Sequence, residues 1–332
     1  MTDVNALVAR EDNEGNVTVH HEVVDGSFLP DGQVQIAVEF SGINYKDALA
    51  VTPRGGVAQR YPLIPGIDAA GTVTASSVPD FAVGDAVIAH GYDIGTGRHG
   101  GYADTARYPA DMIVKLDGLT TAQAAAIGTA GFTAAMSVDV IRAHGVTPSD
   151  GPVLVTGASG GVGSISVDIL AALGYQVVAS TGKDSARELL AELGAGEIVG
   201  RLPEAGQKIR PLAKSTWSAV VDCVGGPTLA YALSTLKYGG IAAVSGLAGS
   251  AELPTTVHPF ILRGVTLAGI DSVLLPISAR RELWDRIAGE LAPRHLDALT
   301  HEIFVSKVPQ TLHTILAGGI TGRTRVVVKD GF

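Results

Sequence analysis

The sequence has little cysteine, and this scarcity excludes two kinds of site. Cys223 is the single cysteine among 332 residues, so neither an internal disulfide nor a four-cysteine zinc site can form. The nine histidines include no pair with the H-E-x-x-H spacing of zinc hydrolases. A single cysteine fits a reducing cytoplasm. Because Cys223 lies in the apolar stretch AVVDCV, we expect it in the core.

Charge and long apolar runs are also scarce. Charged residues make up 17% of the chain and hydrophobic residues 46%, which is typical of a globular protein. The formal net charge of -9 argues against non-specific binding to nucleic acid. No run of about 18 apolar residues is uninterrupted, and the acidic N-terminus lacks a signal-peptide core. We therefore expect about two globular domains and no membrane span.

Glycine, by contrast, is abundant, and one glycine-rich stretch organises the chain. PVLVTGASGGVGSISVDILAALG begins at Pro152. Its apolar start predicts a buried strand, and the apolar residues after the glycines recur at helical spacing. Strand, glycine turn and helix in this order form a dinucleotide-binding site, because the helix N-terminus presents unpaired N–H groups to a pyrophosphate. The glycines alone are compatible with a simple tight turn, but the following segments repeat the same unit. The expected pyrophosphate contacts are Ser159, Gly160, Gly161 and Val162.

Two domains follow from the pattern on either side of this stretch. The pattern of residues 1 to about 120 predicts short strands separated by turns with Gly and Pro. Such a pattern favours a small β-barrel. Strands and helices then alternate, which predicts an α/β fold with a doubly wound parallel sheet. The last forty residues are β-like again. We predict one domain from residues 1–122, completed by 292–332, and a second from residues 123–291.

Several stretches resemble the medium-chain dehydrogenase/reductase superfamily: SGINYKDALA, PLIPGIDAAGTV, GGYADTARY, IGTAGFTA and VTGASGGVGS. More narrowly, NYKD, PGIDAAG, GTAGFTA and LPTTVHPFILRGVTLAGIDSV resemble the NADPH-dependent acrylyl-CoA reductase group, which neighbours the quinone oxidoreductases. The resemblance covers nearly the whole chain. It implies a GroES-like catalytic domain, a Rossmann domain and a cleft between them. It also implies NADPH-dependent reduction of the 2,3 double bond of a short enoyl-CoA. The alternatives are a quinone oxidoreductase and a non-catalytic NADPH-binding protein.

The resemblance also implies that no catalytic zinc is bound. Its zinc-dependent members carry metal ligands at the positions that Asn44, Ile67 and Thr129 occupy here. Because Ile67 cannot ligate a metal, we expect a zinc-free site and no zinc-polarised alcohol oxidation.

Catalysis without zinc needs hydrogen-bond donors, because hydride addition to an enoyl thioester leaves an enolate. The resemblance places Asn44, Tyr45 and Asp68 at the active site. Alternatively, Asn44 and Asp68 satisfy backbone groups of turns. The neighbouring Lys46 and Asp47 read as a surface pair or as the start of a helix.

The residues about 20 positions after the glycines distinguish NAD from NADPH. NAD enzymes carry a carboxylate there. Ser180, Thr181 and Lys183 stand there instead, and two hydroxyls with an ammonium favour the 2′-phosphate of NADPH. Lys183 could also be a solvated surface charge, and we expect Asp184 to cap the next helix. The resemblance adds Thr129 and Thr133 near the nicotinamide, and Arg323 near the phosphates. Ser245 and Leu247 follow a strand at the carboxyl edge of the sheet, where cofactors bind.

Some polar residues and one strand remain. His90, His99 and His258 have no partner visible in the sequence, so we expect packing or surface roles. The arginines that could meet the phosphates of CoA, or simply face solvent, are Arg54, Arg60, Arg98 and Arg263. The apolar segment 265–270 reads as an edge strand, and pairing with its two-fold mate would cover it, so we predict a homodimer.

Overall fold

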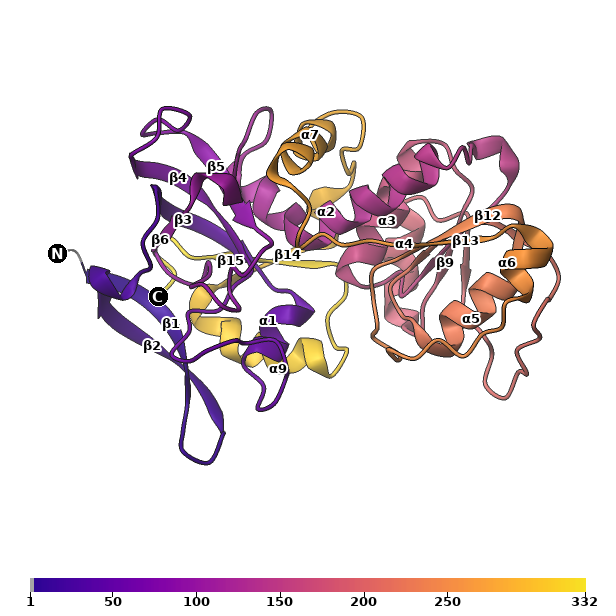
Figure 1. Cartoon of the computed structure of the whole chain (residues 1–332), viewed down its shortest axis with the longest axis horizontal. Coiled ribbons are helices and arrows are strands. Elements are labelled where there is room, and N and C mark those ends of the chain that lie inside the picture. The colour runs from indigo at the N-terminus through magenta and orange to yellow at the C-terminus, as the bar shows by residue number, and fades with distance from the viewer. Residues whose placement is uncertain (1–2) are drawn as a thin grey trace. The chain divides into compact units, whose positions relative to one another are not determined.

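The computed structural model describes residues 3–332 and contains two compact units (Figure 1). The first unit comprises residues 1–129, 272–289 and 300–332, and the second comprises residues 130–271 and 290–299. Relative to the domain boundaries predicted above, residues 123–129 and 272–289 pack with the first unit. Residues 292–299 pack with the second.

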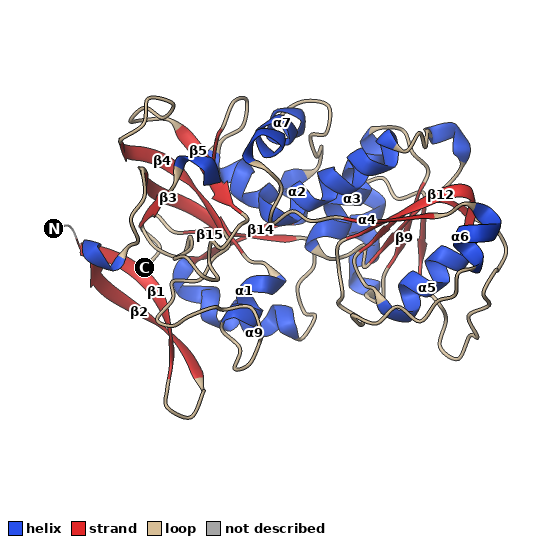
Figure 2. Cartoon of the chain, viewed as in Figure 1, coloured by secondary structure: helices blue, strands red, loops and turns tan. Residues whose placement is uncertain are grey.

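The first unit is built on a seven-stranded, mostly antiparallel sheet, drawn in red in Figure 2. Its strand order is β14-β15-β3-β4-β5-β7, and β6 pairs with β3. Side chains of β3 alternate between buried and half-buried along most of the strand, as a sheet with one face on a core requires. The strands are β3 (Val34–Gly42), β4 (Asp68–Ser76), β5 (Ala86–His90), β6 (Thr105–Tyr108), β7 (Ile113–Lys115), β14 (Thr300–Phe304) and β15 (Arg323–Val327).

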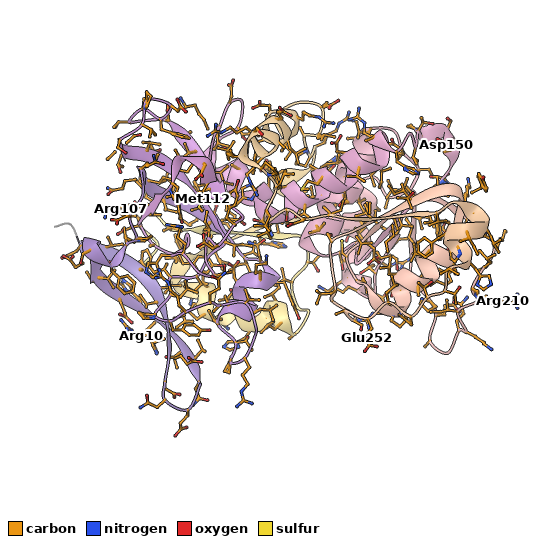
Figure 3. The ribbon with its side chains drawn as sticks, viewed as in Figure 1. Arg10, Arg107, Met112, Asp150, Arg210 and Glu252 are labelled. Atoms are coloured by element: carbon orange, nitrogen blue, oxygen red, sulfur yellow. The ribbon has the colours of Figure 1, made fainter. Side chains whose placement is uncertain are left out.

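A hairpin and three helices complete the first unit. The hairpin pairs β1 (Asp3–Glu11) with β2 (Val17–Asp25), and Arg10 on it binds Glu22 at 2.8 Å (Figure 3). Strand β1 was not predicted from the sequence pattern. The helices are α1 (Tyr45–Ala50), α7 (Ile277–Ile287) and α9 (Val308–Leu316). Helices α1 and α9 lie side by side.

The second unit is a six-stranded parallel sheet in the order β10-β9-β8-β11-β12-β13. The predicted doubly wound sheet is confirmed. All four residues of β8 are buried, as expected for a strand covered on both faces. The strands are β8 (Val153–Thr156), β9 (Val177–Ser180), β10 (Glu197–Val199), β11 (Trp217–Asp222), β12 (Leu236–Val244) and β13 (Thr266–Gly269). The helices are α3 (Gly161–Ala172), α4 (Arg187–Glu192), α5 (Gly226–Thr235), α6 (His258–Arg263) and α8 (Leu296–Leu299).

Helix α2 (Thr121–Ala143) belongs to both units and contains a break. Gly128 has φ 51° and ψ −160°, which interrupts the helical geometry. By length and composition α2 is the one helix within residues 3–332 that could cross a membrane, a segment that we did not anticipate. Because 78% of its most apolar window is buried inside the protein, it has the character of a core helix of a soluble protein.

Candidate active site

The Asp68 carboxylate is the centre of a buried polar cluster in the first unit. Asp68 begins β4 and is fully buried. Its Oδ1 accepts hydrogen bonds from the Thr129 amide at 2.9 Å and from Thr129 Oγ1 at 2.6 Å. Its Oδ2 accepts one from Asn44 Nδ2 at 2.7 Å and lies 3.8 Å from Arg323 Nη2. Such a set of donors holds an ionised carboxylate in one orientation.

Asn44 is held from both ends of its amide. Nδ2 donates to Asp68, while Oδ1 accepts from Arg323 Nη1 at 3.2 Å. Because a guanidinium can only donate and an ionised carboxylate can only accept, the orientation of the amide is determined. The Asn44 side chain also hydrogen-bonds the Asp47 carboxylate, which opposes the rise in the pKa of that carboxyl. The geometry suits a donor to a developing negative charge.

Of the two places expected for Asp47, the start of a helix is confirmed and the surface is not. Asp47 is fully buried in the first turn of α1, where its carboxylate accepts from the amides of Asn44 and Ile67, each at 2.8 Å. Burial, together with the nearby negative charge of Asp68, raises the pKa of Asp47 to about 7. Asp47 thus ties the start of α1 to the residue that precedes Asp68.

His90 is packed in the interior, which is one of its two expected places, and it also has several polar contacts. It ends β5 and is fully buried. Trp284 Nε1 donates to its Nε2 at 2.8 Å, and its Nδ1 lies 3.4 Å from Thr129 Oγ1. The Arg280 guanidinium contacts both ring nitrogens. Burial, followed by the Arg280 charge, holds the pKa of His90 well below its usual range. Nothing in the sequence near His90 indicates these partners.

Arg323 is turned into the first unit. Besides Asn44, it donates to the carbonyls of Ala126 and Ile43, at 2.8 and 3.1 Å. Its Nη2 is buried and has no hydrogen-bond partner within residues 3–332. This geometry supports an orienting role for Arg323 toward Asn44, and its expected contact with cofactor phosphates stays a prediction.

Tyr45 is not part of the cluster. It is the first residue of α1, and its side chain is 44% exposed. The structure therefore brings Asn44, Asp68, Thr129 and Arg323 together but leaves Tyr45 outside. Its catalytic role stays a prediction.

The glycine turn of the second unit has the form that a pyrophosphate site requires. Gly157 has φ +59°, and a Cβ on Gly163 would lie 2.4 Å from the Gly157 carbonyl oxygen. Glycine at both positions therefore lets α3 pack close to β8. The N-cap of α3 is Gly160, which provides no side-chain cap. The first amides of α3, including those of Gly161 and Val162, thus suit an anionic ligand.

Polar groups gather where β9 ends, as expected. Thr181 Oγ1 donates to Ser159 Oγ at 2.8 Å, which joins this end to the glycine turn. Ser180 Oγ donates to the Gly200 carbonyl at 2.9 Å. Lys183 precedes the short 3-10 turn at 184–186 and is half-buried, which lowers its pKa. Asp184 lies inside that turn rather than capping it.

Arg201 is a further cation in this region and was not predicted from the sequence. A Cβ on Gly182 would lie 2.3 Å from Arg201 Nε, so the guanidinium crosses this glycine directly beside Thr181 and Lys183. Arg201 follows β10, and β10 pairs with β9. The sequence signal that could have predicted the role of Arg201 is a cation that follows the strand neighbouring β9.

The remaining expected cofactor residues lie in two places. Thr133 is buried in α2. Ser245 and Leu247 follow β12 and line a cavity of ≈ 500 Å³ in the second unit. Its rim includes Glu252, labelled in Figure 3. Within residues 3–332, no group of three or more His, Cys, Asp or Glu side chains could hold a metal ion.

Comparison with known proteins places these sites in a family. A model described as alcohol dehydrogenase GroES-like domain matches residues 30–118, and one described as zinc-binding dehydrogenase matches residues 161–289. Acrylyl-CoA reductase AcuI of Ruegeria pomeroyi is 46% identical over 98% of this chain and 99% of its own. The chain belongs to the medium-chain dehydrogenase/reductase superfamily.

Solved structures of this superfamily are closely similar to the chain. YhdH of Escherichia coli with bound NADPH has a TM-score of 0.93 and 43% identity, covering 97% of this chain and 99% of YhdH. YhfP of Bacillus subtilis with NAD bound has a TM-score of 0.95 and 46% identity, covering 98% and 100%. Both nucleotides thus occur in similar structures, and the choice between them depends on the end of β9.

Proposed function

We propose that this dehydrogenase/reductase reduces a short 2-enoyl-CoA with NADPH, most specifically acrylyl-CoA to propanoyl-CoA. Hydride adds to the β-carbon, a proton adds to the α-carbon, and NADPH becomes NADP⁺. Bound NADPH supplies the hydride. The similarity to AcuI over nearly the full length of both chains supports this substrate, and the NADPH-bound YhdH supports the cofactor.

The observation that carries the proposal is the oriented amide of Asn44. Hydride addition moves negative charge onto the thioester oxygen, and a donor that is already aligned stabilises this charge without reorganising. Arg323 and Asp68 fix the Asn44 amide from both ends, so the Nδ2 group is held in one orientation. The buried Asp68 therefore acts by orienting Asn44 rather than by touching substrate.

The second unit fits NADPH through two features. The uncapped start of α3 would hold the pyrophosphate. Ser180, Thr181, Lys183 and Arg201 would hold the 2′-phosphate, because no carboxylate follows β9 directly to repel it. Arg201 strengthens the preference predicted from the sequence.

The open edge of β13 supports a homodimer. The single cysteine supports a role in the reducing cytoplasm.

The test is NADPH oxidation at 340 nm with acrylyl-CoA, crotonyl-CoA and a benzoquinone, measured on one preparation. We expect acrylyl-CoA to give the highest kcat/KM. A kcat/KM that is highest with the benzoquinone would replace the proposal by a quinone oxidoreductase. Tight NADPH binding without turnover on any of the three would indicate a non-catalytic binding protein.

A further inference from the structure

Helix α7 contributes two large polar side chains to the interior of the first unit. Arg280 and Trp284 are four residues apart and therefore share a face of the helix, and both are buried. Both reach His90, whose ring also faces Thr129. A chain of contacts thus runs from α7 to the carboxylate that orients Asn44.

The directions of the three hydrogen bonds that join Trp284, His90, Thr129 and Asp68 follow from the first and the last of them. An indole N–H can only donate, so Nε2 of His90 accepts from Trp284 at 2.8 Å. Thr129 Oγ1, 2.6 Å from Asp68 Oδ1, gives its one hydrogen to that oxygen. Thr129 Oγ1 can then only accept from His90, which requires that Nδ1 carries the proton. Trp284 therefore donates to His90, His90 donates to Thr129, and Thr129 donates to Asp68.

Arg280 is consistent with this tautomer because it contacts the face of the imidazole. Its Nη1 lies 3.1 Å from Nδ1 and 3.3 Å from Nε2. Within the ring plane, an atom so near to both nitrogens would overlap the carbon between them. Arg280 is held in place by the carbonyls of Ser272 and Val273, at 3.0 and 3.1 Å. A cation above the ring opposes protonation, which agrees with the lowered pKa of His90.

We propose that Trp284 is a positioning residue of the reductase. By fixing His90 in the neutral Nδ1–H tautomer, it sets the hydrogen bonds of Thr129 and Asp68 and thereby aims Asn44. His90 moves no proton in this role, because it is a neutral donor with a fixed direction. The catalytic part of the proposal rests on the proposed function, whereas the tautomer does not.

The tautomer is tested without turnover. Histidine side-chain nitrogens are observed by ¹⁵N NMR between pH 6 and 8, and the His90 signals are assigned by their loss in His90→Gln. We expect a protonated Nδ1, an unprotonated Nε2 and no titration in this range. Trp284→Phe should turn these signals into a mixture of tautomers. Signals for an Nε2–H tautomer, or titration of His90, would overturn the proposal.

The kinetic test uses the second tryptophan of the chain as a matched control. Trp217 Nε1 is buried but has no hydrogen-bond partner within residues 3–332. Trp217→Phe therefore removes an indole N–H without removing a hydrogen bond. We expect Trp284→Phe to lower kcat with acrylyl-CoA about tenfold, with both KM values within about twofold of wild type. Trp217→Phe should keep the wild-type kcat.

Thr129→Ser and Thr129→Val extend the comparison, because serine keeps the hydroxyl and valine removes it. We expect serine to retain most of kcat and valine to lose at least as much as Trp284→Phe. Equal kcat values for the two tryptophan variants would overturn the positioning role. If wild type does not reduce acrylyl-CoA, the proposed function fails, and the NMR result decides the tautomer independently.

Discussion

At the scale of single residues, the side-chain amide of Asn44 contacts a guanidinium at one end and a carboxylate at the other. Arg323 can only donate to its oxygen, and Asp68 can only accept from its nitrogen. The backbone amide of Asn44 is held by Asp47. Asn44 is therefore fixed at the backbone and at both atoms of the amide, which is the preorganisation that an oxyanion donor needs.

Asn44→Ala should lower kcat with acrylyl-CoA by about 10²- to 10³-fold, because the donor acts mainly in the transition state. The dissociation constant for NADPH should barely change, since the proposed pyrophosphate site lies in the second unit. Melting temperature, NADPH binding and turnover are measured on one preparation. A less stable variant whose folded fraction turns over normally would show that Asn44 only supports a turn.

The proposed 2′-phosphate site includes two cations, of which the sequence pattern singled out only Lys183. Lys183→Glu should raise the KM for NADPH at least about tenfold and leave NADH nearly unaffected, because a charged hydrogen bond of roughly 1.5–3 kcal/mol is lost. Arg201→Leu should shift the KM in the same direction. Lys307→Glu makes the same charge change at an exposed position of the first unit and serves as the control. Equal losses with NADPH and NADH would show that Lys183 does not recognise the phosphate.

At the scale of elements, the break in α2 lies directly against the buried polar cluster around Asp68. Gly128 is in a backbone conformation that L side chains rarely adopt. A Cβ there would lie 2.6 Å from Asp68 Oδ2 and 2.9 Å from Arg323 Nη2. The break therefore lets the following residue, Thr129, direct both its amide and its hydroxyl at Asp68.

Gly128→Ala should reduce both stability and activity. We expect a loss of about 1–3 kcal/mol in the free energy of unfolding from backbone strain, and a kcat at least about tenfold lower because Asp68 must move. Gly145→Ala is the matched control: Gly145 also has a positive φ (+95°), but a Cβ there would meet nothing within 4 Å. Thermal unfolding and turnover separate the effects. An unchanged kcat in Gly128→Ala would mean that the position of Asp68 does not matter.

The sequence predicted local elements better than distant contacts. The glycine turn, its flanking β8 and α3, and the alternation that follows are encoded within short windows, and all are confirmed. The partners of His90 could not be predicted, because Arg280 and Trp284 are 190 and 194 residues away. The burial of Asp47 likewise depends on Ile67, which is 20 residues away.

At the scale of the whole molecule, a buried carboxylate explains one unexpected boundary. Asp168 of α3 is 1% exposed. It accepts from the backbone amide of His295 and contacts its Nδ1, each at 2.8 Å. The pair between Arg142 and Glu290, at 3.3 Å, adds a second attachment. Residues 290–299 therefore return to the second unit before the chain re-enters the first.

The edge of the parallel sheet has the features of a dimer interface. β13 pairs only with β12 among the described strands. Leu267 on it is 38% exposed, and the neighbouring helix α6 carries exposed Ile261 and Leu262. The Ile270 amide donates to β12. Because alternate residues of a strand face the same side, the Leu267 amide faces the open edge.

Leu267→Pro is therefore expected to separate the proposed homodimer without unfolding the chain. Proline removes the outward N–H that a two-fold mate would use, and an edge strand tolerates it because no bond to β12 is lost. Light scattering at micromolar concentration should give a dimer for wild type and for Leu267→Ala, which keeps the amide, and a monomer for Leu267→Pro. Circular dichroism checks that the fold is retained. A wild-type monomer would contradict the homodimer, and a dimer that persists in Leu267→Pro would place the interface away from β13.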